Sequence, residues 1–151
     1  MASKSPADLA GFFADLVRCE TRLYNALNDR LRARHGIVTS QFEFLRFLRE
    51  GSGARVADLA AEFAIGIGAT SKGVDRLENQ GWVRRQPNPS DRRSSLLALT
   101  DEGLLLVEAA ERTFTERLTE LLGGSPVSAA AQALAQLRLV LERDEIGIPA
   151  G

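Results

Sequence analysis

The sequence predicts a mainly α-helical fold that carries one small β-hairpin. Apolar residues recur at steps of three and four over most of the 151 residues, which is the spacing of amphipathic helices. Between residues 82 and 99 the spacing changes to alternation, and a segment dense in turn-forming residues separates two short runs. The longest helical patterns lie near the two ends of the chain, outside the hairpin.

The composition indicates one globular domain covering residues 1–151. Hydrophobic residues make up 44% of the chain and charged residues 26%, which are ordinary values for such a domain. No apolar run is long enough to cross a membrane, and Asp15 and Arg18 interrupt the apolar start of the chain where a cleaved signal would continue. We therefore expect a cytoplasmic protein without membrane association. A single cysteine, Cys19, excludes an intrachain disulfide.

A first long helix is predicted from Pro6 to about Arg34, because proline suits the first turn and a broad apolar face follows it. A face of that length needs a partner, and Gly36 ends the helix. Thr39 or Ser40 is expected to cap the second helix, with a capping box over the four residues from Ser40. The apolar residues that it should bury are Phe44, Leu45, Phe47 and Leu48.

Two short helices joined by a glycine-containing turn are predicted next. Residues 56–63 place apolar side chains on one face, and residues 64–68 break that pattern with two glycines. Helical spacing resumes from Ala69 to Gln80, and Gly81 ends it as a left-handed cap. The inward side of this helix should carry Thr70, Val74 and Leu77, and the outward side Ala69, Ser71, Lys72 and Arg76.

The alternating region predicts a hairpin with a basic tip. Its strands are expected at Trp82–Gln86 and Ser94–Leu99, which places Arg92 and Arg93 at or near the turn. Arg55–Val56 is expected to add a short strand beside it. A protruding basic tip suits the minor groove of DNA, where a narrow cleft concentrates negative potential.

The outward side of the 69–80 helix also suits DNA. Small side chains allow a close approach, while hydroxyls and cations bind phosphates or base edges. The whole chain has a net charge of -1, but residues 64–100 carry six cations and three carboxylates, so this stretch has +3 and the remainder -4. This clustering favours a protein that meets phosphate with one face only.

Two further helices complete the prediction. Thr100 should cap a long helix that runs to Gly123, and Ser125 and Pro126 should start a last helix that frays before Gly147. The apolar faces of the terminal helices exceed what one compact domain covers. We therefore infer that they interleave with a second copy of the chain.

At this point the residues resemble a known family. The run Asp91-Arg92-Arg93-Ser94-Ser95-Leu96-Leu97-Ala98-Leu99-Thr100-Asp101-Glu102-Gly103 is similar to the wing signature of the MarR family of bacterial transcriptional regulators. Residues 75–78 with 81–83 resemble the end of that family's recognition helix, and residues 39–42 resemble the opening of its second helix. In place of the family's usual serine cap, polar or basic residue, and core aliphatic, this chain has Gly66, Ile67 and Gly73.

The resemblance implies a winged helix-turn-helix at residues 39–100, and dimerisation helices at residues 1–35 and 123–147 with part of residues 100–122. It implies a homodimeric repressor that binds palindromic double-stranded DNA and needs no cofactor. Lys72 and Arg76, with Ser71, would enter the major groove, and Arg93, held by Asp91, would enter the minor groove. The full set of expected DNA-contacting residues is Gly68, Ala69, Ser71, Lys72, Arg76, Asp91, Arg92 and Arg93.

The resemblance also implies a small anionic or phenolic effector. Its pocket would lie between the first helix, the second helix and the helix that begins at Thr100, with Arg18 or Arg22 pairing with a carboxylate.

Other readings of the sequence are weaker. A winged-helix protein-interaction module without DNA binding remains the main alternative. A small enzyme lacks support, because there are no paired carboxylates, no nucleophile with a base, and no metal-ligand cluster; residues 66–72 fail the spacing of a phosphate-binding loop. Cys19 as a redox sensor and His35 as a metal ligand both lack the partners that such roles need, so we expect no metal.

Overall fold

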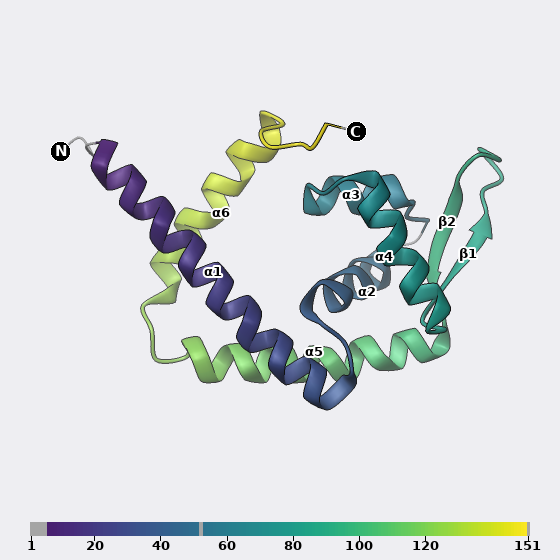
Figure 1. Cartoon of the computed structure of the whole chain (residues 1–151), viewed down its shortest axis with the longest axis horizontal. Coiled ribbons are helices and arrows are strands. Elements are labelled where there is room, and N and C mark those ends of the chain that lie inside the picture. The colour runs from purple at the N-terminus through teal and green to yellow at the C-terminus, as the bar shows by residue number, and fades with distance from the viewer. Residues whose placement is uncertain (1–5, 52, 151) are drawn as a thin grey trace.

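The computed structural model describes residues 6–51 and 53–150, and within them the chain forms six helices and one two-stranded sheet (Figure 1). The predicted fold class is confirmed. In chain order the elements are α1 (Pro6–His35), α2 (Thr39–Glu50), α3 (Val56–Phe63), α4 (Ile67–Asn79), β1 (Val83–Pro87), β2 (Ser95–Leu99), α5 (Asp101–Leu122) and α6 (Val127–Arg143).

The hydrophobic core lies between α2, α4, the hairpin and α5. The inward residues of α4 are fully buried as predicted, and on α2 the prediction holds for three residues, whereas Phe47 is only partly buried. Phe42 was not expected there, yet it is completely buried and its ring lies 4.6 Å from that of Phe114 on α5. This aromatic contact anchors α2 on α5.

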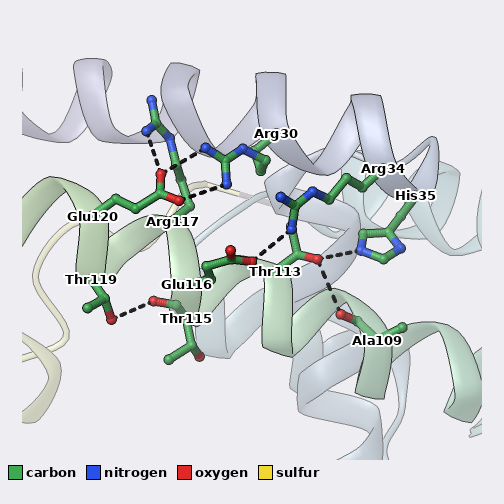
Figure 2. Close-up of polar contacts among 10 residues, drawn as sticks. All are labelled: Arg30, Arg34, His35, Ala109, Thr113, Thr115, Glu116, Arg117, Thr119 and Glu120. Atoms are coloured by element: carbon green, nitrogen blue, oxygen red, sulfur yellow. Dashed lines mark hydrogen bonds and ion pairs between the residues drawn. The ribbon is translucent and has the colours of Figure 1, made fainter.

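Helix α5 is the base of the molecule and connects its two halves (Figure 1). Three polar contacts fasten the end of α1 to it in antiparallel register, as Figure 2 shows: Arg30–Glu120 at 2.8 Å, Arg34–Glu116 at 2.8 Å and His35–Thr113 at 2.7 Å. Hydrogen bonds from Arg30 and Arg117 lower the pKa of Glu120 to about 2, so this contact stays ionic at neutral pH. Arg49 similarly ties α2 to α5 through two bonds to Glu111, at 2.7 and 2.9 Å.

Several helix starts differ from the prediction. The N-cap of α2 is Val38, whose backbone N–H donates to Gln41 Oε1 at 3.0 Å, so the capping interaction begins two residues before Ser40. Helix α4 begins at Ile67, two residues earlier than expected, and α6 begins after Pro126. In each case apolar periodicity located the helix but did not define its first turn, where one or two residues separate the alternatives.

The hairpin has the predicted order, with Val83 paired to Leu99 and Pro87 paired to Ser95. The expected third strand at Arg55–Val56 is wrong. A single bridge forms instead at Ala54, whose carbonyl accepts from Leu97 N at 2.7 Å. Arg55 is already the N-cap of α3, and a residue that enters a helix cannot continue a strand.

A tight junction connects the hairpin to α5. Thr100 Oγ1 accepts from Gly103 N at 3.0 Å, which confirms the predicted cap, and also donates to Gly81 O at 2.6 Å. Thr100 N donates to Trp82 O at 3.0 Å, and the backbone of Gly103 passes so close that a Cβ there would overlap this carbonyl oxygen. Both the threonine and the glycine of the Leu-Thr-x-x-Gly run are therefore required by local geometry.

Helix α6 differs from the other helices because none of its residues is buried. Large apolar side chains are exposed along it and along the first half of α1: Leu9, Phe12, Phe13, Val17, Leu134, Leu137, Leu139, Val140 and Leu141. No helix among the described residues is long and apolar enough to cross a membrane.

We predict that Gly103→Ala lowers the free energy of unfolding by about 2 kcal/mol or more, because the new methyl group forces the junction apart. Urea unfolding followed by circular dichroism measures the effect. Gly11→Ala is the matched control, since a Cβ at that exposed helical position meets nothing within 4 Å and helix propensity alone stabilises it by about 0.5–1 kcal/mol. Equal stability of the two variants would contradict the steric account.

Candidate nucleic-acid interface

The turn between α3 and α4 holds α4 with one side buried and one side outward. Ala64 ends α3 in the left-handed conformation, at φ 50°. Gly66 is the N-cap of α4 but contributes no side-chain bond, and Thr70 Oγ1 donates to its carbonyl at 2.8 Å instead. This bond ties the buried Thr70 to the first turn of α4, whereas the free N–H groups of that turn receive no side-chain cap from Gly66.

The outward side of α4 carries the residues that the sequence placed there. Gly68, Ala69, Lys72 and Arg76 are exposed, and Ser71 is half-buried. A convex helical surface with small residues near its N-terminus and cations after them has the shape and charge to enter a major groove.

The tip of the hairpin presents Arg92 and Arg93 to solvent. Arg93 N donates to Asp91 Oδ1 at 3.0 Å, and its Nε lies 3.5 Å from the same oxygen, while 93% of the Arg93 side chain stays accessible. The turn is closed at its base by a bond of 3.1 Å from Asn88 Nδ2 to Ser94 Oγ. Asp91 therefore positions Arg93 without burying it, which matches the predicted relation between these two residues.

Arg85 braces the hairpin on α4, which the sequence analysis missed. Its Nη2 lies 2.7 Å from Asp75 Oδ1 and its Nη1 lies 2.8 Å from Glu78 Oε1. Sequence spacing gave no signal for this contact, since it depends on how β1 packs against α4.

The brace also changes the electrostatics of this surface. Every carboxylate between residues 64 and 100 is paired, two with Arg85 and one with Arg93. Lys72, Arg76 and Arg92 have no ion-pair partner among residues 6–51 and 53–150. The outward surface therefore presents cations whose charge is not cancelled locally.

A cavity of about 630 Å³ lies behind α4, and its lining includes Ala69 and Arg76 of this surface. Its lining comes from α1, from the start and middle of α2, from the end of α3, and from α4. No residue of α5 lines it, and neither do Arg18 and Arg22, so it differs from the effector pocket that the sequence suggested. The size is in the range of small-molecule sites.

Glu43 is the acidic group of this cavity. The Tyr24 hydroxyl donates to Glu43 Oε1 at 3.4 Å. Burial raises the pKa of Glu43 above the usual glutamate range, and the Tyr24 bond and the charges of Arg46 and Arg138 oppose that rise. Burial and the neighbouring Glu43 raise the pKa of Tyr24 to about 12, so the phenol stays protonated.

Other candidate chemistry is not assembled. Cys19 is exposed on α1, and His35 bonds Thr113, with burial and then Arg34 and Arg112 lowering the pKa of its ring. Within the described part of the chain, no group of three or more His, Cys, Asp or Glu residues is placed to hold a metal ion.

A helix-turn-helix followed by a basic hairpin defines a winged helix-turn-helix protein of the DNA-binding class. Comparison with known sequences agrees: the MarR family model matches residues 37–95. The multiple antibiotic resistance protein MarR of Escherichia coli is 32% identical over 109 residues, which cover 70% of this chain and 75% of that protein. The chain belongs to the MarR family of DNA-binding transcriptional regulators.

Solved structures of the family show the same architecture. A cysteine-to-serine mutant of Escherichia coli MarR, complexed with operator DNA, superposes with a TM-score of 0.78 at 25% identity, over 92% of this chain and 99% of that one. The transcriptional repressor CouR bound to a DNA duplex gives a TM-score of 0.76 at 27% identity, over 91% and 99%. CouR from Rhodococcus jostii was also solved with p-coumaroyl-CoA.

We predict that Arg85→Ala weakens DNA binding by about tenfold and lowers stability by about 1–3 kcal/mol, because it leaves two carboxylates unpaired beside the outward surface. Fluorescence anisotropy with labelled duplex DNA measures the affinity. The matched control is Arg84→Ala, which removes the same charge from the adjacent residue, on the side of β1 that faces Thr100 and Glu102. An equal loss of DNA affinity in both variants would mean that the net charge of the protein, and not the contact of Arg85 with the two carboxylates, determines binding.

Proposed function

We propose that this protein is a homodimeric repressor, acting in the cytoplasm, that binds a palindromic double-stranded DNA operator. One observation carries the proposal. The exposed side of α4 and the tip of the hairpin belong to one packed unit, and each presents at least one cation that has no ion-pair partner among the described residues. The DNA complexes of E. coli MarR and CouR support it by fold and family. The proposal includes no catalytic step.

Each expected contact has a defined role in this proposal. Ser71, Lys72 and Arg76 enter the major groove, where the small Gly68 and Ala69 allow the helix to approach closely. Arg92 meets the phosphate backbone. Arg93 enters the minor groove with its orientation set by Asp91, and its nearly complete exposure leaves the guanidinium free to do so.

The dimer follows from the terminal helices. Most of the stability of a helix in a protein comes from packing of its apolar face, and α6, with 17 residues, buries none of its side chains within the chain. Of the predicted dimerisation helices at residues 1–35 and 123–147, with part of 100–122, those that the structure describes, from residue 6 on, therefore pack on a second copy, while residues 39–100 form the reading unit. Two-fold symmetry places the two copies of α4 about 34 Å apart, which is one turn of DNA.

We predict that Arg93→Ala weakens DNA binding by about tenfold or more at moderate salt while the dimer stays folded, because a minor-groove cation is lost. Anisotropy titrations measure affinity, and circular dichroism checks the fold. Arg32→Ala, at an exposed position of α1, should bind as the wild type does. Unchanged DNA affinity in Arg93→Ala would contradict the proposed role of Arg93 in the minor groove.

The salt dependence of the same titrations separates this proposal from a winged-helix interaction module. Phosphate neutralisation makes log K fall with log salt by about 0.9 for each contact. A module that binds only protein would show no DNA binding to weaken.

We predict that Phe13→Glu disrupts the dimer, because this ring is 64% exposed in the single chain and belongs to the apolar set that a second copy should cover. Sedimentation velocity would show a shift from dimer toward monomer. A wild type that is monomeric at high concentration would contradict the proposed assembly.

A further inference from the structure

The cavity behind α4 depends on a glycine. A Cβ at Gly73 would lie 3.1 Å from Cε2 of Phe44, so even a methyl group would crowd this ring. A longer side chain on this face would project into the space that the cavity occupies. Glycine within a helix costs about 1 kcal/mol relative to alanine. Gly73 therefore lets the Phe44 ring pack against α4 in the wall of the cavity, at a cost to α4 itself.

The walls of the cavity combine apolar and acidic character. Phe44, Phe63 and Ile65 provide an apolar surface beside Gly73. Glu43 is the one carboxylate of the lining, and no cation among the described residues forms an ion pair with it. Its hydrogen-bond partner is the neutral Tyr24 hydroxyl.

The nearby arginines are engaged elsewhere. Arg46 lies 3.7 Å from Glu111, and Arg138 lies 3.3 Å from Glu62. Arg76 also lines the cavity; it is exposed and forms no ion pair with Glu43. A half-buried carboxylate without a cationic partner gains from a cation that enters beside it, while an anionic ligand would be repelled.

We propose that this cavity binds a small organic cation, with a protonated amine paired to Glu43 and a flat apolar body lying against the rings of Phe44 and Phe63, which contact each other at a centroid distance of 5.4 Å, and against Gly73. The charge is opposite to that of the anionic effector which the sequence suggested. The ligand lies against α4, so its effect on DNA binding, which rests on the proposed function, is to displace the reading helix and weaken operator binding. By linkage, DNA must weaken ligand binding by the same factor.

Calorimetric titration of the DNA-free protein tests the binding directly. The probes are a matched set with one ring system: 2-naphthylmethylamine, 2-naphthylmethanol and 2-naphthoate. The amine should bind about ten- to hundredfold more tightly than the carboxylate, because a charge-assisted bond to Glu43 replaces a repulsion. Failure of the amine to bind, or tighter binding of the carboxylate, would overturn the proposal.

Two substitutions assign the effect to residues. Glu43→Gln keeps the shape of the side chain and should remove the preference for the amine, whereas Glu108→Gln at an exposed position of α5 should leave it intact. Gly73→Leu should abolish binding of the amine and the alcohol alike; if that variant fails to fold, Gly73→Ala should weaken both. Retention of the preference in Glu43→Gln would contradict the pairing.

The pH dependence gives an independent readout. Protonation of Glu43 removes its charge, so amine affinity should fall as the pH is lowered, beginning above the ordinary glutamate range because burial raises the pKa of Glu43. The cationic groups near Glu43 are Arg46, Arg76 and Arg138, and Tyr24, whose pKa is raised to about 12, stays protonated throughout this range. A flat profile would contradict the ion pair.

Anisotropy titration of duplex DNA with and without the amine tests regulation separately. Weaker DNA binding in its presence supports the regulatory part, and equal binding contradicts it. Because ligand binding is measured without DNA, a protein that binds the amine but no DNA would refute the proposed function while leaving the cavity assignment standing.

Discussion

The close approach of Gly103 to the Trp82 carbonyl is the constraint on which the rest of the structure depends. At this point the end of α4, the start of β1, the end of β2 and the first turn of α5 meet. Thr100 joins three of them by bonding to Gly81, Trp82 and Gly103. The contacts that fix the angle between α4 and the hairpin therefore also orient α5.

On the reading unit, the attraction for phosphate depends more on where the charged side chains lie than on the net charge of the chain. A chain with a net charge of -1 binds phosphate only if its cations are concentrated and its carboxylates are neutralised where the DNA lies. Arg85 pairs with two carboxylates, which offsets one of their two negative charges, and braces the hairpin, and Asp91 contacts Arg93. The carboxylates, whose negative charges would otherwise weaken the attraction for phosphate, thus help to hold the shape of the DNA-facing surface.

Periodicity and turn chemistry predicted the order of the elements, the buried face of α4 and the Thr100 cap, since these depend on residues close in sequence. The outward residues of α4 and the exposed arginines at the tip were also predicted for that reason. Their contacts with DNA remain predictions. The Arg85 brace, the role of Phe42 and the Glu43 cavity were missed, because each arises where distant segments pack together. Gly73 was visible in the sequence as a departure from the family pattern. That it lies against the ring of Phe44 could not be predicted, because this contact depends on how α2 packs on α4.

The most direct test of the account is selection of random double-stranded DNA by the purified protein at two salt concentrations, followed by sequencing. The account predicts an enriched palindrome at both concentrations, with half-site centres about one helical turn apart, since two symmetric copies of α4 read it. Enrichment of a single half-site would contradict the two-fold assembly. No enrichment from a folded dimer would contradict sequence-specific recognition by this surface.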